Sequence, residues 1–411
     1  MTAILSIVIP TRNRFSYAKS AIKSVLAIDS SDIELVIQDS SDSNELGLWI
    51  ESRINDKRVI YNYSIPPFSM TDNFNRAVDL ASGDYVCIIG DDDGVNPEIV
   101  AAAYWARDNS LDALSPSLTG ANYYWPDFRS CDYGDSHAGK LFINKFTGKM
   151  VFPNIELEMQ KCVESAGQKK FGLPKVYFGL VRRGCLLKVR KVVGKYFEGV
   201  SPDVFGALAI ANNGGRVCVI DYPLVLPGSS GGSNSGRSAL GKHKGNLKDD
   251  PHMVGYYISQ WPEYVPKFFS VQTVWAEAAV EALSAVRRYD LMNNFNWNLL
   301  YALCIVYHPD YFSITIRSFM GFVRSRKESY VRAVACLLKF GVFVILRRLA
   351  RFVYRTIFPD RGIRENKFEG VADIESAVRV LMEYLRKSGK SFECFVVRDS
   401  VGKILTKSEH F

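Results

Sequence analysis

Three consecutive carboxylates follow an apolar run in the first quarter of the chain. Residues 85–89 are apolar enough to form a buried strand, and the aspartates at 91–93 follow it after a single glycine. Because adjacent negative charges repel one another, such a group usually needs a positive counter-ion. Carboxylate oxygens at a strand end suit Mg²⁺ or Mn²⁺, ions that proteins often share with the phosphates of a nucleotide. A solvated acidic turn is the alternative, since Gly94 and Pro97 follow closely.

The residues before the aspartates alternate between strand-like and helix-like segments. Short apolar strands are predicted at residues 4–10, 33–38 and 59–61, and amphipathic helices at 17–26 and 73–80. This alternation predicts an α/β fold, with a mostly parallel sheet and helices on both faces. Ligands bind such sheets beyond the carboxyl ends of the strands. Polar residues stand at three of these ends, at Thr11 and Arg12, at Asp39 and at 91–93, so we expect a binding site there.

In this order and spacing, the residues resemble the nucleotide-sugar-binding half of a family 2 glycosyltransferase with the GT-A fold. The matching motifs are residues 6–14, 35–41, 73–77 and 83–85, the last leading into the aspartates at 91–93. The resemblance is closest over residues 1–100 and weaker over 100–235. It implies a Rossmann-like GT-A domain at 1–240, with a donor-binding half at 1–100 and an acceptor half at 101–240. A mostly helical, basic region is expected at 241–411.

The resemblance also implies which residues form the site. The donor-binding positions of the family fall here on Pro10, Thr11, Arg12, Asp39, Asn75 and Asp91. The metal positions fall on Asp91, Asp92 and Asp93, with Asp92 as the best single candidate for direct contact with Mn²⁺ or Mg²⁺. The register of the family's Asp-x-Asp motif is ambiguous, because its first aspartate falls on Gly90. The family usually has two carboxylates after the second strand, whereas this chain has Gln38 and Asp39 there. This difference puts recognition of the nucleotide base in doubt.

The implied reaction moves a sugar from a nucleotide-sugar donor, most simply a UDP-sugar, to a hydroxyl of a glycan or a lipid-linked acceptor. A divalent cation would neutralise the departing diphosphate, and inversion at the sugar needs a general base on the opposite side. Asp203 is the first candidate base and Glu198 the second. Ser201 and Pro202 signal a helix start, so Asp203 lies in a first turn, where an acid also stabilises the helix dipole without any catalytic role.

Positive charge is concentrated in the last third of the chain. From residue 287 to 411 there are 22 Lys and Arg against 12 Asp and Glu, a net of +10, whereas the whole chain is +8. An apolar run at 333–346 precedes an arginine-rich segment at 347–355. The run is too short to cross a bilayer, which needs about 20 apolar residues. A basic amphipathic helix over 333–356 is therefore expected to contact the membrane surface peripherally, although a helix packed on the protein with solvated arginines is the alternative.

Composition limits the possible metal sites and the cellular location of the protein. The eight cysteines include no Cys-x-x-Cys pair, which argues against zinc and fits a reducing compartment. The apolar start ends at Pro10, too early for a signal peptide. We therefore expect a cytoplasmic protein, peripheral on the inner face of a bacterial cell membrane, that acts in capsule, O-antigen or other surface-polysaccharide synthesis. The arginines are not accompanied by a nucleic-acid-binding module, so no nucleic acid is expected, and self-association is left open.

Several segments keep two interpretations. The Gly- and Ser-rich stretch 227–238 is either a linker or a lid over the donor. Tyr124 and Phe128 either help form the acceptor side or are ordinary core residues. Residues 391–397 are predicted as an isolated strand. The alternative for the whole chain is a non-catalytic scaffold that binds a sugar or nucleotide within a glycan-assembly complex.

Overall fold

The centre of the protein is a large sheet of eight strands in the order β3-β2-β1-β4-β10-β6-β11-β9. The computed structural model describes residues 3–65, 68–116, 120–132, 134–170, 172–250, 253, 258–357 and 364–401. The strands of the sheet are β1 (Leu5–Thr11), β2 (Ile33–Asp39), β3 (Val59–Tyr63), β4 (Tyr85–Ile88), β6 (Ala113–Pro116), β9 (Met150–Val151), β10 (Leu180–Arg182) and β11 (Val217–Ile220). β1 to β4 are mutually parallel, as are β6 and β11, while β9 and β10 run antiparallel to their neighbours. The predicted mostly parallel α/β sheet is confirmed.

The register of the first strands brings the predicted polar strand ends together. All seven residues of β1 are buried, which is typical of a parallel strand covered on both faces. In the pairing of β1 with β2, Thr11 lies opposite Asp39, and Val8 lies opposite Ile88 of β4. The acidic run follows β4 within a few residues, so the ends of three neighbouring strands meet at one edge of the sheet.

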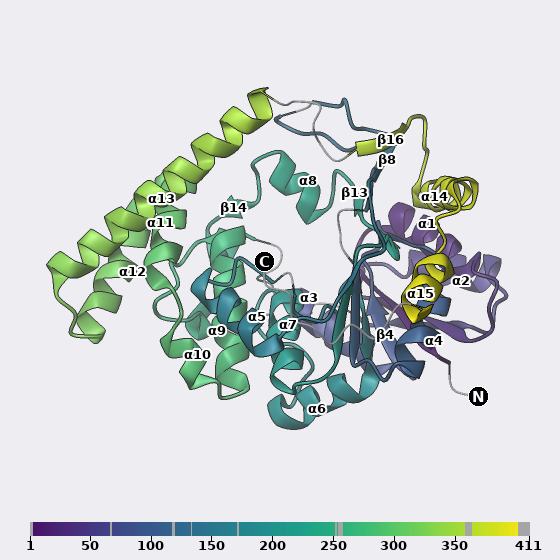
Figure 1. Ribbon diagram of the computed structural model, residues 1–411, viewed down its shortest axis with the longest axis horizontal. Helices are drawn as coiled ribbons and strands as arrows, with labels where there is room; N and C mark the ends of the chain where they lie inside the picture. Colours follow the sequence, from purple (N-terminus) through teal and green to yellow (C-terminus); the bar gives the residue numbers. More distant parts are fainter. Residues whose placement is uncertain are drawn as a thin grey trace.

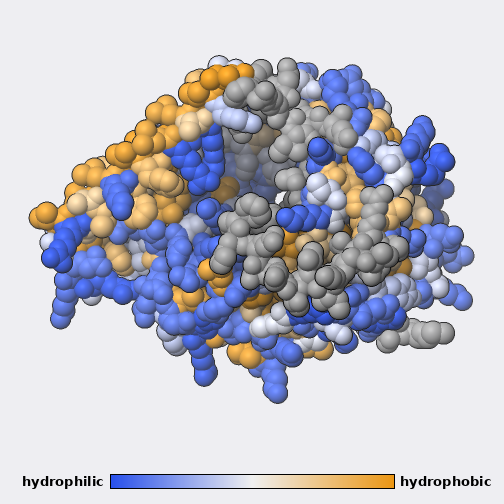
Figure 2. Space-filling model, in the orientation of Figure 1, coloured by the Kyte–Doolittle hydropathy of each residue, from blue (hydrophilic) through white to orange (hydrophobic). Residues whose placement is uncertain are grey.

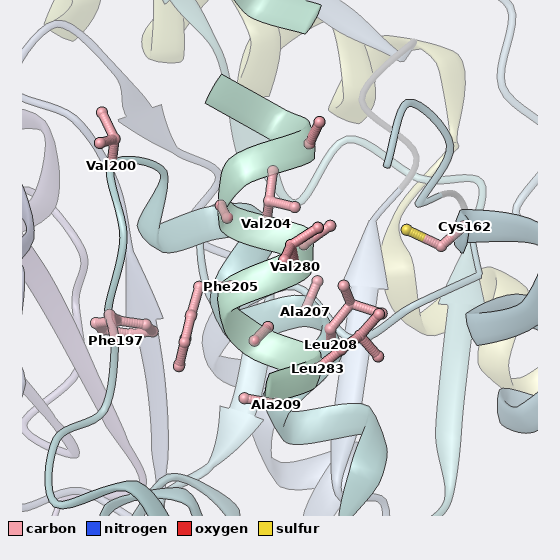
Figure 3. Close-up of a cluster of buried hydrophobic side chains, with 14 of the residues drawn as sticks. Cys162, Phe197, Val200, Val204, Phe205, Ala207, Leu208, Ala209, Val280 and Leu283 are labelled. Carbon is pink, nitrogen blue, oxygen red and sulfur yellow. The ribbon is translucent and has the colours of Figure 1, made fainter. Parts of the chain in front are cut away.

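Helices cover both faces of the sheet (Figure 1). One face carries α1 (Phe15–Leu26), α2 (Glu45–Arg53), α4 (Ile99–Asp108), α14 (Ile374–Ser388) and α15 (Phe392–Val401); the other carries α3 (Met70–Asp79), α5 (Ile155–Glu164), α6 (Arg183–Val193), α7 (Pro202–Asn212) and α9 (Val271–Ala285). Side chains of β1 alternate between the two cores, with Val8 in one and Ile7 and Ile9 in the other. Figure 3 shows Val280 and Leu283 of α9 packed beside Val204 and Leu208 of α7.

Shorter pairings extend the structure beyond the main sheet. β5 (Gly94–Val95) pairs with β12 (Val225–Leu226), and β14 (Lys244–Gly245) pairs with β15 (Phe269–Ser270). A four-stranded sheet has the order β13-β7-β8-β16, with β7 (Ala121–Tyr124), β8 (Lys140–Asn144), β13 (Gly228–Ser229) and β16 (Arg364–Phe368). The connections also contain α8 (Asn234–Ala239) and the 3₁₀ turns η1 (Leu247–Asp249) and η3 (Ile258–Gln260).

The region after α9 is mostly helical, as expected from the sequence. It contains α10 (Tyr289–Asn293), α11 (Trp297–Tyr307), the 3₁₀ turn η4 (Pro309–Tyr311), α12 (Phe312–Ser325) and the long α13 (Tyr330–Ile357). Among the described residues, no single helix is both long and apolar enough to cross a membrane. One pair of helical segments, Trp297–Tyr307 and Pro309–Ser325, meets the length and composition criteria together but is bent by 119°.

The end of the chain returns to the main sheet. β16 pairs antiparallel with β8, and α14 contributes Ile374, Val378 and Leu381 to the core that contains β1 and α1. Gly94 permits this approach, since a Cβ there would lie 2.6 Å from a methyl group of Val378. Segments from both sides of residue 240 therefore contribute to the same core, and the division of the chain into domains at that residue stays a prediction.

One predicted element is wrong. Residues 391–397, expected as an isolated strand, lie mainly in the helix α15. Its first residue, Phe392, is buried against the edge of the Trp105 ring, and its backbone N–H donates to Glu98 Oε1 at 3.2 Å. The phenylalanine and valines of this segment favour a strand locally, but packing against α4 selects a helix.

Candidate active site

Two of the predicted acidic residues share one arginine. Arg14 Nε lies 2.7 Å from Asp91 Oδ1, and Arg14 Nη2 lies 2.9 Å from Asp92 Oδ2. The hydroxyl of Thr11 donates to Asp91 Oδ2 at 2.7 Å, and that of Ser230 donates to Asp92 Oδ2 at 2.6 Å. Both aspartates are buried, with 6% of each residue exposed. The structure thus joins the end of β1, the acidic run and the Gly- and Ser-rich stretch in one cluster.

Asp93 has a different set of partners from its two neighbours. Its Oδ1 accepts from the backbone N–H of Gly228 at 2.7 Å, and its Oδ2 accepts from the N–H of Gly90 at 2.7 Å and from the Tyr177 hydroxyl at 3.0 Å. Both oxygens are therefore engaged in holding the turn after β4 and the start of β13. Metal binding by Asp93 stays a prediction, and it would require some of these bonds to break.

The backbone of β13 is pressed against the acidic run. A Cβ on Gly228 would lie 1.8 Å from the carbonyl oxygen of Asp92, so a side chain cannot be accommodated there. The same carbonyl accepts a hydrogen bond from the indole Nε1 of Trp125 at 2.9 Å. Together with the Ser230 contact, these bonds position the first part of the predicted lid or linker directly over Asp92.

Burial and charge shift the acid–base properties of the cluster. Burial and the neighbouring Asp92 charge raise the pKa of Asp91 to about 6, against the opposing effect of the Arg14 charge. Burial and the Asp92 charge also raise the pKa of Asp93. Burial disfavours the charged form of Arg14, yet the two carboxylates hold its pKa above the usual value. The cluster therefore requires a positive charge between Asp91 and Asp92, which the guanidinium supplies.

Asp39 lies where the sequence predicted it, opposite Thr11, and is fully buried. Its Oδ1 accepts from the N–H of Ser41 at 2.8 Å and from the Ser41 hydroxyl at 2.5 Å, and its Oδ2 accepts from the Tyr61 hydroxyl at 3.0 Å. Arg12 instead points to the exposed Asp42, with 3.5 Å between Nη2 and Oδ1. A donor contact by Asp39 or Arg12 stays a prediction.

Asn75 connects α3 to the segment that precedes α7. Its Oδ1 accepts from the N–H groups of Tyr196 and Phe197 at 2.9 and 3.0 Å. Its Nδ2 donates to the carbonyl oxygens of Phe197 and Thr71 at 2.9 and 3.0 Å. The whole amide is therefore used for positioning, and the predicted donor contact would require one of these bonds to break.

Two residues earlier on the same helix, Asn73 has an unused acceptor. Its Nδ2 donates to the carbonyl oxygen of Thr11 at 3.2 Å, but its buried Oδ1 accepts no hydrogen bond from any described residue. A buried acceptor left in this state is costly, and such atoms often serve ligands. Asn73 lies in the motif 73–77 that the sequence singled out. The sequence alone does not show that Asn73, and not Asn75, has the unused acceptor.

Asp203, the predicted base, is the second residue of α7 and follows Pro202. Its Oδ2 pairs with the ammonium of Lys170, and its Oδ1 accepts from the Ser201 hydroxyl at 2.5 Å. Burial alone would raise the pKa of Asp203, but Lys170 and these hydrogen bonds lower it below the usual value. The carboxylate is therefore ionised at neutral pH. Lys170 also lies over the Trp275 ring, 4.3 Å from its centre.

Glu198 lies in an acidic environment that the sequence did not reveal. Burial raises the pKa of Glu281 on α9 to about 6, and the charge of Glu198 contributes to this shift. Glu277, one turn earlier on α9, is fully buried, and its Oε2 accepts from the N–H of Val200 at 3.0 Å. Glu277 and Glu281 are four residues apart on α9, but the segment 198–200 that they approach is far away in the sequence.

The donor set fits a divalent cation by type. Asp91 and Asp92 offer carboxylate oxygens to Nε and Nη2 of one guanidinium, and Mg²⁺ usually takes one or two carboxylates together with substrate phosphates. Within the described ranges, no three or more His, Cys, Asp and Glu side chains converge as a metal cage. The pair therefore fits a cation that is shared with a phosphate group, and Arg14 stands where that positive charge would act.

A cavity of about 470 Å³ lies beside β13, which contributes Ser229 to its lining. Its lining includes Tyr124, Phe128, His137, Ser229 and Ser238. The rings of Tyr124 and His137 stack with centres 5.0 Å apart. Aromatic faces beside hydroxyl groups are suited to sugar rings, and Ser229 is adjacent to the residue that contacts Asp92.

With this geometry in place, the chain can be compared with known proteins. Residues 6–132 match the model of glycosyl transferase family 2. The chain is 33% identical over 94 residues to the GalNAc(5)-diNAcBac-PP-undecaprenol β-1,3-glucosyltransferase of Campylobacter jejuni, a match of 22% of this chain and 29% of the relative. It is 36% identical over 96 residues to Escherichia coli WcaA, whose name assigns it to colanic acid biosynthesis, a match of 23% of this chain and 34% of the relative.

The matches thus span about a third of each relative or less. Among solved structures, S. aureus TarS 1–349 in complex with UDP-GlcNAc is 15% identical with a TM-score of 0.44, covering 80% of this chain and 93% of that one. The mannosyltransferase PcManGT from Pyrobaculum calidifontis, in complex with GDP-Man and Mn²⁺, is 14% identical with a TM-score of 0.41, covering 92% and 87%. Likenesses at this level say nothing about the chemistry of this chain.

Proposed function

We propose that the protein is a glycosyltransferase that moves a sugar from a nucleotide-sugar donor, most simply a UDP-sugar, to a hydroxyl of a glycan or lipid-linked acceptor. The observation that carries this proposal is the buried pair Asp91 and Asp92, bridged by Arg14 at the carboxyl end of β4. Ligands of parallel α/β sheets bind at this edge. The family match covers all of these residues. The Campylobacter relative, named for an undecaprenol-linked glycan, supports a lipid-linked acceptor in surface-polysaccharide synthesis.

The donor would bind where the three strand ends meet. Arg14 supplies a positive charge for the diphosphate, and the unused Oδ1 of Asn73 can accept a hydrogen bond from a donor hydroxyl. Asp91 and Asp92 would hold Mn²⁺ or Mg²⁺, which supplies further positive charge to the departing diphosphate. A positive charge at this point favours the transition state, in which the diphosphate becomes more negative.

Transfer with inversion requires a base for the acceptor hydroxyl. The acceptor oxygen attacks the anomeric carbon, the bond from that carbon to the phosphate oxygen breaks, and the hydroxyl proton passes to the base. Asp203 is suited to this role, because Lys170 and Ser201 keep its carboxylate ionised. Glu198 is the second candidate. Its charge interacts with that of Glu281 and helps to raise the pKa of Glu281.

A non-catalytic scaffold is the second candidate function, and one observation favours it. Arg14 already places a positive charge beside Asp91 and Asp92 inside the protein, so their negative charges are countered without donor or metal. A scaffold would bind a nucleotide sugar and leave it intact. Turnover therefore separates the two functions, whereas binding alone does not.

The first experiment is a thermal-shift assay of the full chain against UDP, GDP, dTDP and CMP, with and without Mn²⁺. We expect one nucleotide to stabilise the protein in a metal-dependent manner, and Asp92→Asn to abolish the effect. Asp108→Asn, at an exposed aspartate that pairs only with its neighbour Arg107 among the described contacts, is the matched control and should retain it. Absence of stabilisation by every nucleotide would contradict the proposed donor site.

The matching nucleotide sugar is then assayed for release of the nucleoside diphosphate with an acceptor extract. Release that requires Asp203 supports the transferase, while binding without release supports the scaffold. We further propose that the protein acts in the cytoplasm at the inner face of the bacterial cell membrane, where a lipid-linked acceptor is presented.

A further inference from the structure

The helix α13 is attached to the protein by one side only. It packs along α11, and Ala333 and Val344 are its buried residues, with 2% and 3% exposed. Arg348 Nη1 donates to the carbonyl oxygen of Val306 at 3.2 Å on the same side. Figure 1 shows the helix running along the outer edge of the molecule, away from the main sheet. Its other side therefore faces outward over its whole length, about 42 Å for 28 residues.

The outward side is apolar. Its exposed residues are Val331, Val334, Leu338, Val342, Ile345, Leu346, Leu349, Phe352, Val353 and Ile357. At about 100° per residue they occupy a continuous stripe of roughly 140°, centred opposite the buried Val344. Figure 2 shows this stripe as a hydrophobic band along the edge of the molecule. Single exposed apolar residues are ordinary, but a continuous band marks a contact surface.

The charge of α13 has one sign. Between residues 330 and 357 there are six Lys and Arg and no Asp or Glu. On the helical wheel Lys339 and Arg332 border the apolar stripe on one side, and Arg348 borders it on the other. Two copies of this helix packed face to face would bring like charges together with no acid to pair with them. An anionic lipid bilayer complements both features, since its hydrocarbon suits the apolar stripe and its phosphate groups suit the cations at the borders.

We propose that the apolar face of α13 docks onto an anionic lipid bilayer, with the helix lying in the plane of the interface. Valine, leucine and phenylalanine side chains enter the upper part of the hydrocarbon, and the bordering cations contact lipid phosphates. The inference rests on α13 alone and does not require the proposed reaction. It also explains why the stripe is left uncovered by the remaining described residues of the chain.

Co-sedimentation of the full chain with vesicles tests the proposal. Vesicles of phosphatidylcholine with phosphatidylglycerol are compared with phosphatidylcholine alone, at low and high salt. We expect binding to the anionic vesicles that weakens at high salt. The double variant Leu338→Glu, Leu349→Glu should bind about tenfold more weakly or worse, since two exposed leucines that would enter the bilayer become charged. Arg332→Gln with Lys339→Gln, which removes the two exposed cations on one border of the stripe, should lower binding to anionic vesicles by about fivefold per charge.

The matched control is Leu48→Glu with Leu157→Glu, which places the same charges on exposed leucines of α2 and α5. It should bind vesicles like the unchanged protein, and thermal melting should show that all variants are folded. Equal loss in the control, or no binding to anionic vesicles, would overturn the proposal. Light scattering coupled to gel filtration tests whether a second copy of the chain, and not a bilayer, covers the apolar face of α13. A dimer that dissociates in Leu338→Glu, Leu349→Glu, without vesicle binding, would assign the face to a second copy and also overturn the proposal.

Discussion

Arg14 is the residue on which the acidic cluster depends. It bridges Asp91 and Asp92 inside the protein, so Arg14→Met would leave two buried carboxylates without their counter-charge. We expect the free energy of unfolding to fall by about 3–5 kcal/mol, the usual cost of breaking a buried ion pair from one side. Urea denaturation of the variant and the unchanged protein measures this difference. Added Mn²⁺ should recover more stability in Arg14→Met than in the unchanged protein.

Arg12→Met is the control for this prediction. Arg12 pairs with Asp42 at the surface, where an ion pair contributes at most about 1 kcal/mol. If the two variants lose the same small amount of stability, the charge of Arg14 is not what holds the cluster together.

Lys170 controls the protonation of the proposed base. Because Lys170 helps to hold the pKa of Asp203 below its usual value, Lys170→Met should raise that pKa. A base must be deprotonated to act, so the acid limb of the pH profile of kcat/KM should move to higher pH in the variant. The exposed neighbour Lys169→Met is the matched control and should leave the limb in place. An acid limb that does not move in Lys170→Met would argue for Glu198 instead.

Among the elements, α3 connects the proposed donor site to the segment that leads to the proposed general base, Asp203. Asn75 fixes the backbone of residues 196–197, from which the chain leads through Glu198 to Asp203. Asn75→Ala removes these bonds, and we expect a loss of about 2–3 kcal/mol in the free energy of unfolding. Because the base is displaced while the strand ends stay in place, kcat should fall more than the KM for the donor changes.

The control for this element is Asn109→Ala at the end of α4, where the amide donates only to the carbonyl oxygen of Trp105 among the described contacts. It should cost less stability and leave kcat unchanged. A rise in donor KM with unchanged kcat in Asn75→Ala would instead support the direct donor contact predicted from the sequence.

The sequence predicted the elements whose residues lie close together along the chain. The apolar runs of β1, β2 and β4 and the helical spacing in α1 and α3 were sufficient to locate the acidic run at a strand end. The partner of that run was not predicted, since no spacing rule says that Arg14 folds back onto Asp91. Glu277 and Glu281 were missed because they approach the segment 198–200 only after the chain has folded. α15 was predicted as a strand because its local preference is overridden by packing on α4.

At the scale of the whole molecule, the last helices stabilise the sheet that bears the site. Leu381 of α14 is fully buried in the core that contains β1, so Leu381→Ala should lower the free energy of unfolding by about 2–5 kcal/mol. The same change at the exposed Leu338 of α13 should cost no more than about 0.5 kcal/mol. Chemical denaturation of both variants, followed by nucleotide binding, checks this. Equal stabilities would mean that α14 contributes little to this core.

The hydrogen bond from Trp125 to the carbonyl oxygen of Asp92 has an optical consequence. The emission of an indole responds to its polar contacts, and this indole also packs on the edge of Tyr17 with ring centres 4.9 Å apart. A ligand that shifts the backbone of the acidic run will therefore change the fluorescence of Trp125. The signal of Trp125 is isolated from that of the other five tryptophans by subtracting the spectrum of Trp125→Phe. The protein carries its own label-free reporter of binding, at the carbonyl of the residue most expected to contact the metal ion.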